Sequence, residues 1–290
     1  MTLEQALNAY VNRFTGSSRK SMRQRLKGFT AHVKSLGITV ATEITTEHIE
    51  QWLVTLCKKR LKPWSVYAYV SAVRQLFATL NKEKYLTQNP WPKHLKTKRP
   101  ACGMRYVPTK EKMVELLEAA SACPYPCRTR AILELGYGCG LRRMELRNLN
   151  VEDIEGDTVR IRGKGGKERL VPCGATARQW IDKYVNGERL QAVKANNPLE
   201  VALFVSERGN RLSVGSYEII IRKLRLGGKA TGISMHSLRH ACATHMLRNG
   251  ASIVVLQKLL GHSHVTTTEI YTKVTTDDLQ AVLAKNHPRG

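Results

Sequence analysis

The sequence predicts a mainly helical protein of two domains, with a small β-hairpin in the second. Apolar residues recur every three or four positions along most of the 290 residues, which is the period of amphipathic helices. A basic, Pro-rich stretch without this period, residues 89–108, separates residues 1–88 from residues 109–290. Two short runs with strand character, residues 157–162 and 168–172, flank a Gly- and Lys-rich turn in the second part.

The first domain is expected to contain four short amphipathic helices. The apolar spacing predicts them over residues 2–14, 18–36, 45–60 and 64–80, and Gly37 is the expected end of the second. Their aromatic residues recur at helical spacing. We therefore expect these aromatic side chains in the core rather than on a base-stacking surface.

The linker is expected to be extended, with lysines that can follow a phosphate backbone. The second domain then alternates helical patterns with the two strands of the hairpin. Its predicted helices lie near residues 109–120, 127–137, 141–147, 175–185 and 213–226, a short strand lies near 203–205, and the remaining helices follow from residue 232, the last over 276–284.

Both domains carry a large excess of positive charge. The chain has 47 Lys and Arg against 23 Asp and Glu, a formal net charge of +24. Residues 1–98 hold 17 basic and 5 acidic residues, so the excess is not confined to one tail. Such an excess usually marks a polyanionic partner, and we expect the two domains to hold it as the halves of a clamp. A ribosomal or chromatin-packing protein would be as basic but usually of lower complexity.

Targeting signals are not evident. No apolar run reaches the roughly 18 to 20 residues that span a bilayer, and the N-terminal residues lack a signal-peptide pattern. The 7 cysteines are scattered, which fits a reducing compartment, and Cys123 and Cys127 have no second pair nearby to complete a zinc site. We expect a soluble cytoplasmic protein.

Residues 232–273 hold the densest group of chemically active side chains. His236 and His240 lie on one face of a predicted helix, as two zinc ligands would. A zinc-protease motif needs Glu directly after the first His, but Ser237 stands there, and the Arg239 guanidinium would repel a metal. No metal is predicted.

The turn over residues 163–167 resembles a phosphate-binding P-loop only in composition. Glu168 follows Lys167 where that motif requires Ser or Thr, and a strand rather than a helix comes next. No nucleotide cofactor is predicted.

Phosphoryl transfer without a metal suits these residues better. Arginines match the geometry of phosphate oxygens and stay protonated. A tyrosine can attack phosphorus to form a covalent intermediate, and a lysine or histidine can protonate the leaving oxygen. Glu269 is the only carboxylate between residues 232 and 273, which favours an anionic substrate.

Five short motifs follow one another along the second domain. They are Cys139-Gly140-Leu141-Arg142-Arg143-Met144-Glu145-Leu146, Gly163-Lys164-Gly165, His236-Ser237-Leu238-Arg239-His240, Leu260-Gly261-His262 and Thr266-Thr267-Thr268-Glu269-Ile270-Tyr271. In order and spacing this set resembles the motif series of the tyrosine recombinases, the family of lambda integrase, Cre and Xer. The helical first domain and basic linker also resemble that family's core-binding domain, so the resemblance covers nearly the whole chain.

The resemblance implies a site-specific DNA recombinase, with a core DNA-binding domain over residues 1–88 and a catalytic domain over residues 109–290. Arg142 and Arg239 would hold the scissile phosphate. Tyr271 would attack it and form a 3′-phosphotyrosyl link with release of a 5′-hydroxyl.

The resemblance also implies supporting roles. Lys164 would protonate the leaving oxygen, His236 would accept the proton of the nucleophile, and His262 would stabilise the transition-state oxygens. Glu145 would support the site through a bond to an imidazole or an arginine, and His240 is expected to be structural.

Some alternatives stay open at the level of sequence. Lys167 lies in the same turn as Lys164, so either ammonium can be the general acid. Tyr106 and Tyr217 are other possible nucleophiles, although neither follows the His-Arg and Gly-His motifs. His264 is expected to be a loop residue.

The expected partners are double-stranded DNA at a specific site and three further copies in a tetramer, with a related recombinase or accessory proteins as alternatives. The apolar Leu279, Val282 and Leu283 suggest that the last helix docks on a neighbouring protomer. The absence of an arm-binding domain favours recombination at a simple core site. A type IB topoisomerase and a catalytically silent accessory protein of the same fold are the rival functions.

Overall fold

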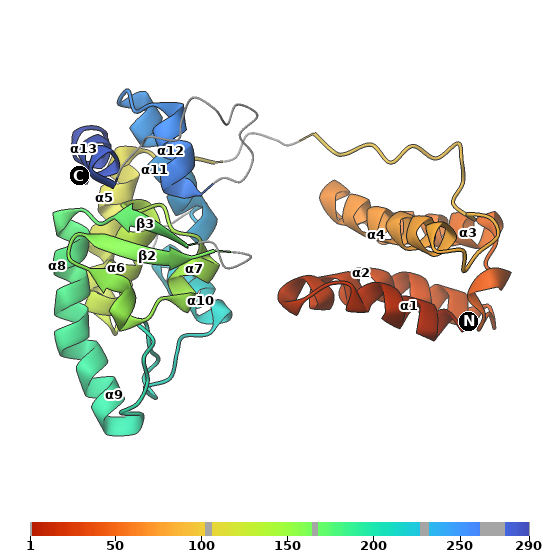
Figure 1. The fold of residues 1–290 in the computed structure, drawn as a ribbon, viewed down its shortest axis with the longest axis horizontal. Coiled ribbons are helices and arrows are strands. Elements are labelled where there is room, and N and C mark those ends of the chain that lie inside the picture. The colour runs from red at the N-terminus through yellow and green to blue at the C-terminus, as the bar shows by residue number, and fades with distance from the viewer. Residues whose placement is uncertain (1, 102–105, 164–167, 227–231, 262–275, 290) are drawn as a thin grey trace. The chain divides into compact units, whose positions relative to one another are not determined.

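The computed structural model describes the chain except residues 1, 102–105, 164–167, 227–231, 262–275 and 290. It divides into two compact units, Met1–Gly103 and Met104–Gly290, and the division falls within the predicted linker. Helices dominate both units, and the described sheet has three strands (Figure 1). The predicted fold class is therefore confirmed.

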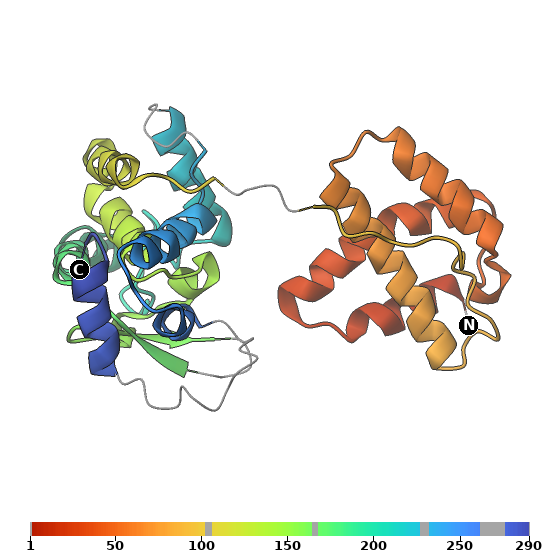
Figure 2. The ribbon, with the colours of Figure 1, turned by 90° about the horizontal axis from the view of Figure 1, so that it is seen from above.

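The N-terminal unit contains the four predicted helices. These are α1 (Leu3–Asn12), α2 (Gly16–Ser35), α3 (Thr46–Lys58) and α4 (Pro63–Lys82). Thr2 and Thr45 begin α1 and α3 as N-caps, since each side chain accepts a backbone N–H of the first turn. Helix α4 packs against the other three (Figures 1 and 2).

Aromatic rings form the centre of this unit. Phe29 makes edge-to-face contacts with Trp52 and Phe77, with ring centroids 5.3 Å and 5.6 Å apart. All three side chains are buried. These aromatic residues are core residues, as their spacing predicts.

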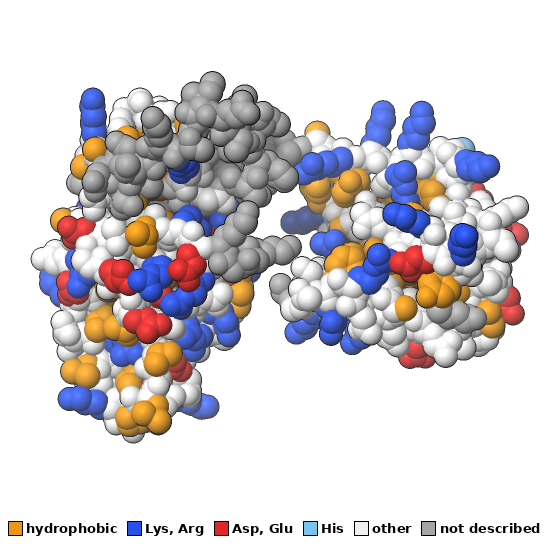
Figure 3. Space-filling model, in the orientation of Figure 1, with side chains coloured by type: hydrophobic (Ala, Val, Ile, Leu, Met, Phe, Trp, Pro, Cys, Tyr) orange, Lys and Arg blue, Asp and Glu red, His pale blue; other side chains and the backbone are white. Residues whose placement is uncertain are grey.

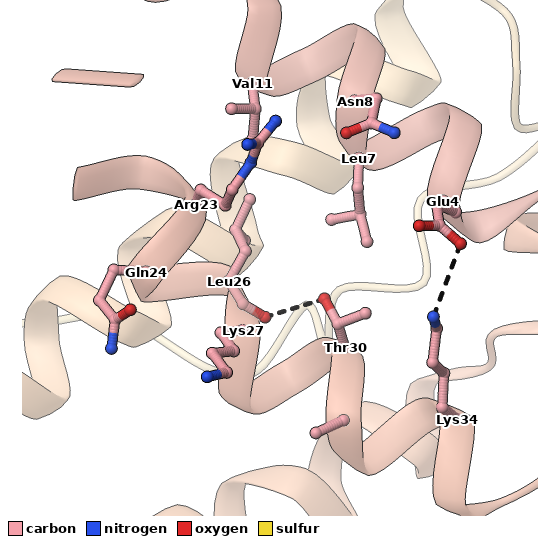
Figure 4. Close-up of a pocket in the computed structure, with 11 residues that line it drawn as sticks. Glu4, Leu7, Asn8, Val11, Arg23, Gln24, Leu26, Lys27, Thr30 and Lys34 are labelled. Carbon is pink, nitrogen blue, oxygen red and sulfur yellow. Dashed lines mark hydrogen bonds and ion pairs between the residues drawn. The ribbon is translucent and has the colours of Figure 1, made fainter. Parts of the chain in front are cut away.

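An open groove of about 460 Å³ runs between α1 and α2. Figure 4 shows apolar Leu7, Val11 and Leu26 along it, with an ion pair of 3.6 Å between Lys34 and Glu4 at one end. No predicted catalytic residue lines this groove. The predicted catalytic residues belong to the second unit instead.

The C-terminal unit is built around α6, whose side chains are buried along most of its length. It packs against α5, α7, α8 and α11. The helices of this unit are α5 (Lys110–Ala119), α6 (Pro126–Tyr137), α7 (Arg143–Asn148), α8 (Ala175–Tyr184), α9 (Leu190–Asn196), α10 (Val214–Leu226), α11 (Met235–Arg248), α12 (Ile253–Leu260) and α13 (Thr276–Asn286).

The sheet consists of β1 (Ile154–Glu155), β2 (Thr158–Arg162) and β3 (Glu168–Pro172), antiparallel and in chain order. Val159 opposes Val171, and both are buried. Ile161, also buried, opposes Arg169. Because directly opposed residues share one face of a sheet, Arg169 lies on the side that faces the core.

Two sequence predictions in this unit need correction. The strand predicted near residues 203–205 is wrong, because the segment forms only isolated bridges, one of which joins Val205 and Arg211. The helix predicted over 175–185 continues through a π-helical turn, Val185–Arg189, into α9. The buried Arg189 side chain donates to two backbone carbonyls of the 200–202 segment, and this tertiary contact is invisible in the sequence pattern.

Helix α13 packs on its own chain, against β3, α11 and α12. Leu283 is buried and Val282 packs against the same core, whereas the side chain of Leu279 lies outside the described residues. Arg289 forms an ion pair of 2.6 Å with Glu134, a fully buried residue of α6. Two of the apolar side chains that suggested docking on a neighbour are thus used within the protomer.

In the part of the chain that the structure describes, no helix is both long and apolar enough to cross a bilayer. The same residues contain no group of three or more His, Cys, Asp or Glu side chains that could bind a metal ion.

Candidate active site

Arg142, Glu145 and Arg239 lie together in the described part of the C-terminal unit, where α7, α11 and the end of α12 meet. His236 lies on α11 as well. The other predicted site residues lie outside the described residues: Lys164, His262 and Tyr271, together with the alternative Lys167 and the loop residue His264.

Arg142 and Glu145 are joined at the start of α7. Arg142 has an extended backbone and is the N-cap, so the helix begins at Arg143, two residues later than predicted. Its backbone N–H donates to Glu145 Oε2 and its Nη1 donates to Oε1, both over 2.8 Å. A glutamate three residues after the cap is well placed for this bond and suits the positive end of the helix.

Arg239, on α11, is buried and reaches the same carboxylate. Its Nη1 donates to the Gly140 carbonyl over 2.7 Å and lies 3.9 Å from Glu145 Oε2. Gly140 has φ of +62°, and a Cβ there would lie 2.5 Å from Leu260 Cδ2. Glycine is therefore required for the close approach of this loop to the end of α12.

A third arginine, Arg169 of β3, was not among the predicted site residues. Its Nη1 and Nη2 donate to the two carboxylate oxygens of Glu145, each over 3.0 Å. The sequence held a signal for it, because the alternation of β3 places Arg169 on the face of the buried Val171. An arginine facing a core needs a carboxylate partner, but that partner lies 24 residues away in the chain.

The three arginines also bind three consecutive carbonyls at the end of α12. Arg169 Nε donates to Leu259 O over 3.3 Å, Arg239 Nη2 to Leu260 O over 2.5 Å, and Arg142 Nη2 to Gly261 O over 3.0 Å. The carbonyl end of a helix carries partial negative charge, so these contacts stabilise it. They fix the position from which the chain continues toward His262.

The electrostatics of this cluster favour an anion. Burial alone raises the pKa of the Glu145 carboxyl, but hydrogen bonds from Arg169 and Arg142 outweigh burial and leave the pKa below its ordinary value. Burial, followed by the charge of Arg142, lowers the pKa of Arg239 to about 10. Three guanidinium groups thus surround one carboxylate, and an incoming phosphate would relieve their repulsion.

Exposure distinguishes the arginines. The side chain of Arg142 is 42% exposed, whereas those of Arg169 and Arg239 are 18% and 5% exposed. Arg142 is therefore the guanidinium most open to a ligand from solvent.

His236 and His240 contact each other on α11. Their Nε2 atoms are 2.9 Å apart and the rings meet edge to face. One ring must donate a proton in this bond and the other must accept it.

Tyr217, an alternative nucleophile, is unsuited to the role. Its side chain is fully buried, and its hydroxyl has no hydrogen-bond partner in the part of the chain described. Burial raises the pKa of the phenol above its ordinary value, which disfavours the phenolate. Tyr106 is 51% exposed, so burial gives no argument against it.

Known protein families match most of the chain. The N-terminal SAM-like domain of phage integrases matches residues 9–84, and the phage integrase family itself matches residues 107–277.

Individual relatives align over almost their full length. The chain is 34% identical to the tyrosine recombinase XerD of Mycobacterium tuberculosis over 311 aligned positions, covering 100% of this chain and 99% of that protein. It is 33% identical to the tyrosine recombinase XerC of Oceanobacillus iheyensis, covering 93% and 90%. A lambda integrase tetramer bound to a Holliday junction has a similar fold, with a TM-score of 0.69 at 20% identity, covering 92% of this chain and 76% of that one.

Proposed function

The chain belongs to the phage integrase family and is a site-specific tyrosine recombinase, and from this premise we propose which residues carry its reaction. Arg142 and Arg239 hold the non-bridging oxygens of the scissile phosphate. Tyr271 attacks the phosphorus and its phenolic oxygen forms the new bond, while the bond to the 5′ oxygen breaks. The product is a 3′-phosphotyrosyl link and a free 5′-hydroxyl.

Proton transfers accompany both bond changes. Lys164 gives its proton to the leaving 5′ oxygen, with Lys167 of the same turn as the alternative donor. His236 accepts the phenolic proton, and His262 donates a hydrogen bond to the phosphate oxygens. A 5′-hydroxyl from another strand then attacks the phosphotyrosine, which joins the two strands and releases the Tyr271 phenol. The scheme needs no metal or nucleotide, because the phosphotyrosine retains the energy of the phosphodiester bond.

The arginine cluster around Glu145 is the observation that carries this proposal. It assembles segments far apart in the chain into one anion-binding site, with Arg142 open to solvent and Arg239 held by backbone carbonyls. Such preorganised charge stabilises the phosphoryl transition state without reorganisation during the reaction.

We assign duplex DNA binding to both parts of the chain, residues 1–88 as the core-binding domain and residues 109–290 as the catalytic domain, joined by the linker 89–108. Helices α2 and α4, which pack together, contain no Asp or Glu. Figure 3 shows more Lys and Arg than Asp and Glu over the visible face of the N-terminal unit. Charge of this kind binds the DNA backbone.

We infer a homotetramer on DNA, by analogy with the lambda integrase tetramer of similar fold. A related recombinase or accessory proteins are the alternative partners. The proposed place of action is the bacterial nucleoid in the cytoplasm.

Covalent capture tests the nucleophile. The probe is a pool of nicked duplexes of random sequence, incubated with the protein in a chelator of divalent metals and then denatured. We expect wild-type protein to retain a subset of sequences covalently and Tyr271→Phe to retain none. Equal retention by Tyr271→Phe would refute the assignment.

The captured sequence also separates the rival functions. A recombinase joins strands only between plasmids that carry this sequence. A topoisomerase relaxes supercoiled plasmids with or without it, and a silent accessory protein binds it without becoming attached.

A further inference from the structure

Arg169 uses its whole guanidinium group for contacts within the arginine cluster. Its fork to Glu145 and its bond to Leu259 O engage all three guanidinium nitrogens. With the side chain only 18% exposed, little of it remains for a substrate. Arg169 therefore contacts the groups that hold the phosphate-binding arginines, rather than the phosphate itself.

The first of these groups is the Glu145 carboxylate. Oε1 accepts from the side chains of Arg142 and Arg169, and Oε2 accepts from the Arg142 backbone and from Arg169. Removal of Arg169 would leave half of these bonds unmade. The carboxylate would then have lone pairs free to draw Arg142 and Arg239 away from a phosphate.

The second group is the last turn of α12. Gly261 ends this helix in the left-handed conformation, with φ of +63°, and a Cβ there would lie 3.0 Å from Arg169 Cζ. The guanidinium of Arg169 thus packs directly against the turn whose next carbonyls hold Arg239 and Arg142. Loss of this support would let the carbonyls of Leu260 and Gly261 shift.

We propose that Arg169 is a positioning residue of the recombinase. It holds Glu145 and the end of α12 in place, and these groups in turn hold Arg142 and Arg239 where they can bind the phosphate. This inference rests on the proposed function. Its effect should appear in the rate of phosphotyrosyl formation and not in DNA affinity.

The test compares Arg169→Gln with wild type on a nicked duplex of the captured sequence. We expect covalent adduct to form about 10- to 100-fold more slowly, the usual effect of losing a supporting partner, with unchanged DNA affinity. Arg169→Lys keeps the charge, but an ammonium cannot make the paired hydrogen bonds to both carboxylate oxygens of Glu145. It should therefore restore only part of the rate. Arg178→Gln is the control, because Arg178 Nε donates to both carboxylate oxygens of Asp182 on α8, outside the site, and its loss should leave the rate unchanged.

A second substrate separates positioning from general loss of structure. A methylphosphonate at the scissile position lacks one anionic oxygen and so depends less on the arginines. If Arg169 acts through the arginines, the ratio of wild-type to Arg169→Gln rates should fall at least several-fold on this substrate. An equal ratio on both substrates would overturn the proposal, and so would a wild-type rate in Arg169→Gln.

A double-mutant cycle tests the route through Glu145. Arg169→Gln should slow the Glu145→Gln protein by a smaller factor than it slows wild type, because the Glu145–Arg169 contact is already broken and only the support of α12 through Leu259 O remains to be lost. Multiplied effects would contradict the inference while the proposed function stands. If wild-type protein captures no duplex from the pool, the proposed function fails first and the inference falls with it.

Discussion

Arg239 and Glu145 are the buried charged residues of the proposed phosphate site. Both are buried charged groups, which is tolerated only where partners compensate the loss of hydration. Glu145 is compensated by Arg142 and Arg169, while Arg239 is held by carbonyls and retains a lowered pKa of about 10. The positive charge buried in the cluster thus exceeds the negative charge there, and a substrate phosphate would neutralise the excess.

Replacement of Arg239 by lysine tests whether the planar guanidinium group, with its several N–H donors, is needed. An ammonium keeps the charge but cannot bind the carbonyls of Gly140 and Leu260 and a phosphate in one plane. We expect Arg239→Lys to slow adduct formation by about 10²- to 10³-fold, as for loss of a preorganised donor, with DNA affinity retained. Arg248→Lys, at the exposed end of the same helix, should match wild type. A similar rate in both variants would exclude the role of Arg239.

The lowered pKa of Glu145 predicts a pH-dependent stability. Its folded pKa lies below the ordinary value of 4.5, so the unfolded state takes up the proton first as the pH falls. The stabilisation is complete above pH 4.5 and is lost as the pH falls through the folded pKa. The difference in free energy of unfolding between wild type and Glu145→Gln should therefore shrink below this pH in urea titrations. A pH-independent difference would contradict the ion-pair account.

At the scale of elements, the end of α12 is the meeting point of the site. Three arginines from α11, β3 and the start of α7 bind its last carbonyls. Gly140 allows the preceding loop to approach the end of α12 closely.

The C-terminal tail is also held by contacts between distant elements, since Arg289 and His287 secure α13 to α6. Deletion of residues 275–290 would consequently remove Arg289, one of the two arginine partners of buried Glu134, and leave Arg130 as the other.

Gly140→Ala should weaken the contact with α12. The positive φ and the 2.5 Å approach to Leu260 Cδ2 predict a loss of about 1–3 kcal/mol in free energy of unfolding. Gly28→Ala is the control, because Gly28 lies within α2 and a Cβ there meets nothing within 4 Å. That change should stabilise the protein by roughly 0.5–1 kcal/mol. Equal effects of the two substitutions in urea unfolding would refute the packing argument.

His287 should make the C-terminal tail sensitive to acid. Burial lowers its pKa from 6.5 to about 4, and Nδ1 accepts the Arg289 backbone N–H, a bond that protonation breaks. The neutral form is favoured in the folded state, so tail docking is strongest above pH 6.5 and weakens as the pH falls toward about 4. The total loss is on the order of 3 kcal/mol.

Hydrogen exchange of α13 measures this effect. Exchange in wild type should accelerate between pH 6.5 and about 4, after correction for the intrinsic rate. His287→Asn removes the titrating group and should flatten the change, while Tyr137, Arg289 and the neighbouring His245 stay in place. An identical pH profile in the variant would assign the effect elsewhere, for example to His245, whose pKa burial also lowers.

Across the whole molecule, the features that depend on local sequence pattern could be predicted from the sequence. Apolar periodicity located all four N-terminal helices, and the ordered motifs indicated the family. Arg169 was missed because its partner Glu145 is distant in the chain, although strand alternation placed it toward the core. The strand predicted at 203–205 was wrong because the backbone of Val205 bonds to side chains: its N–H donates to Tyr184 Oη and its carbonyl accepts from Arg128 Nη1. Long-range polar contacts of this kind have no periodic signature.

In the proposed reaction, one phosphate, held by Arg142 and Arg239, is attacked by Tyr271. Mass spectrometry of the captured adduct tests it most directly, because tryptic cleavage after Lys258 and Lys273 gives a peptide with Tyr271 as its only tyrosine. We predict that the nucleotide mass is found on Tyr271 in wild type and that adduct is strongly reduced when Arg142 or Arg239 is replaced. A nucleotide on Tyr106 or any other side chain would contradict the account.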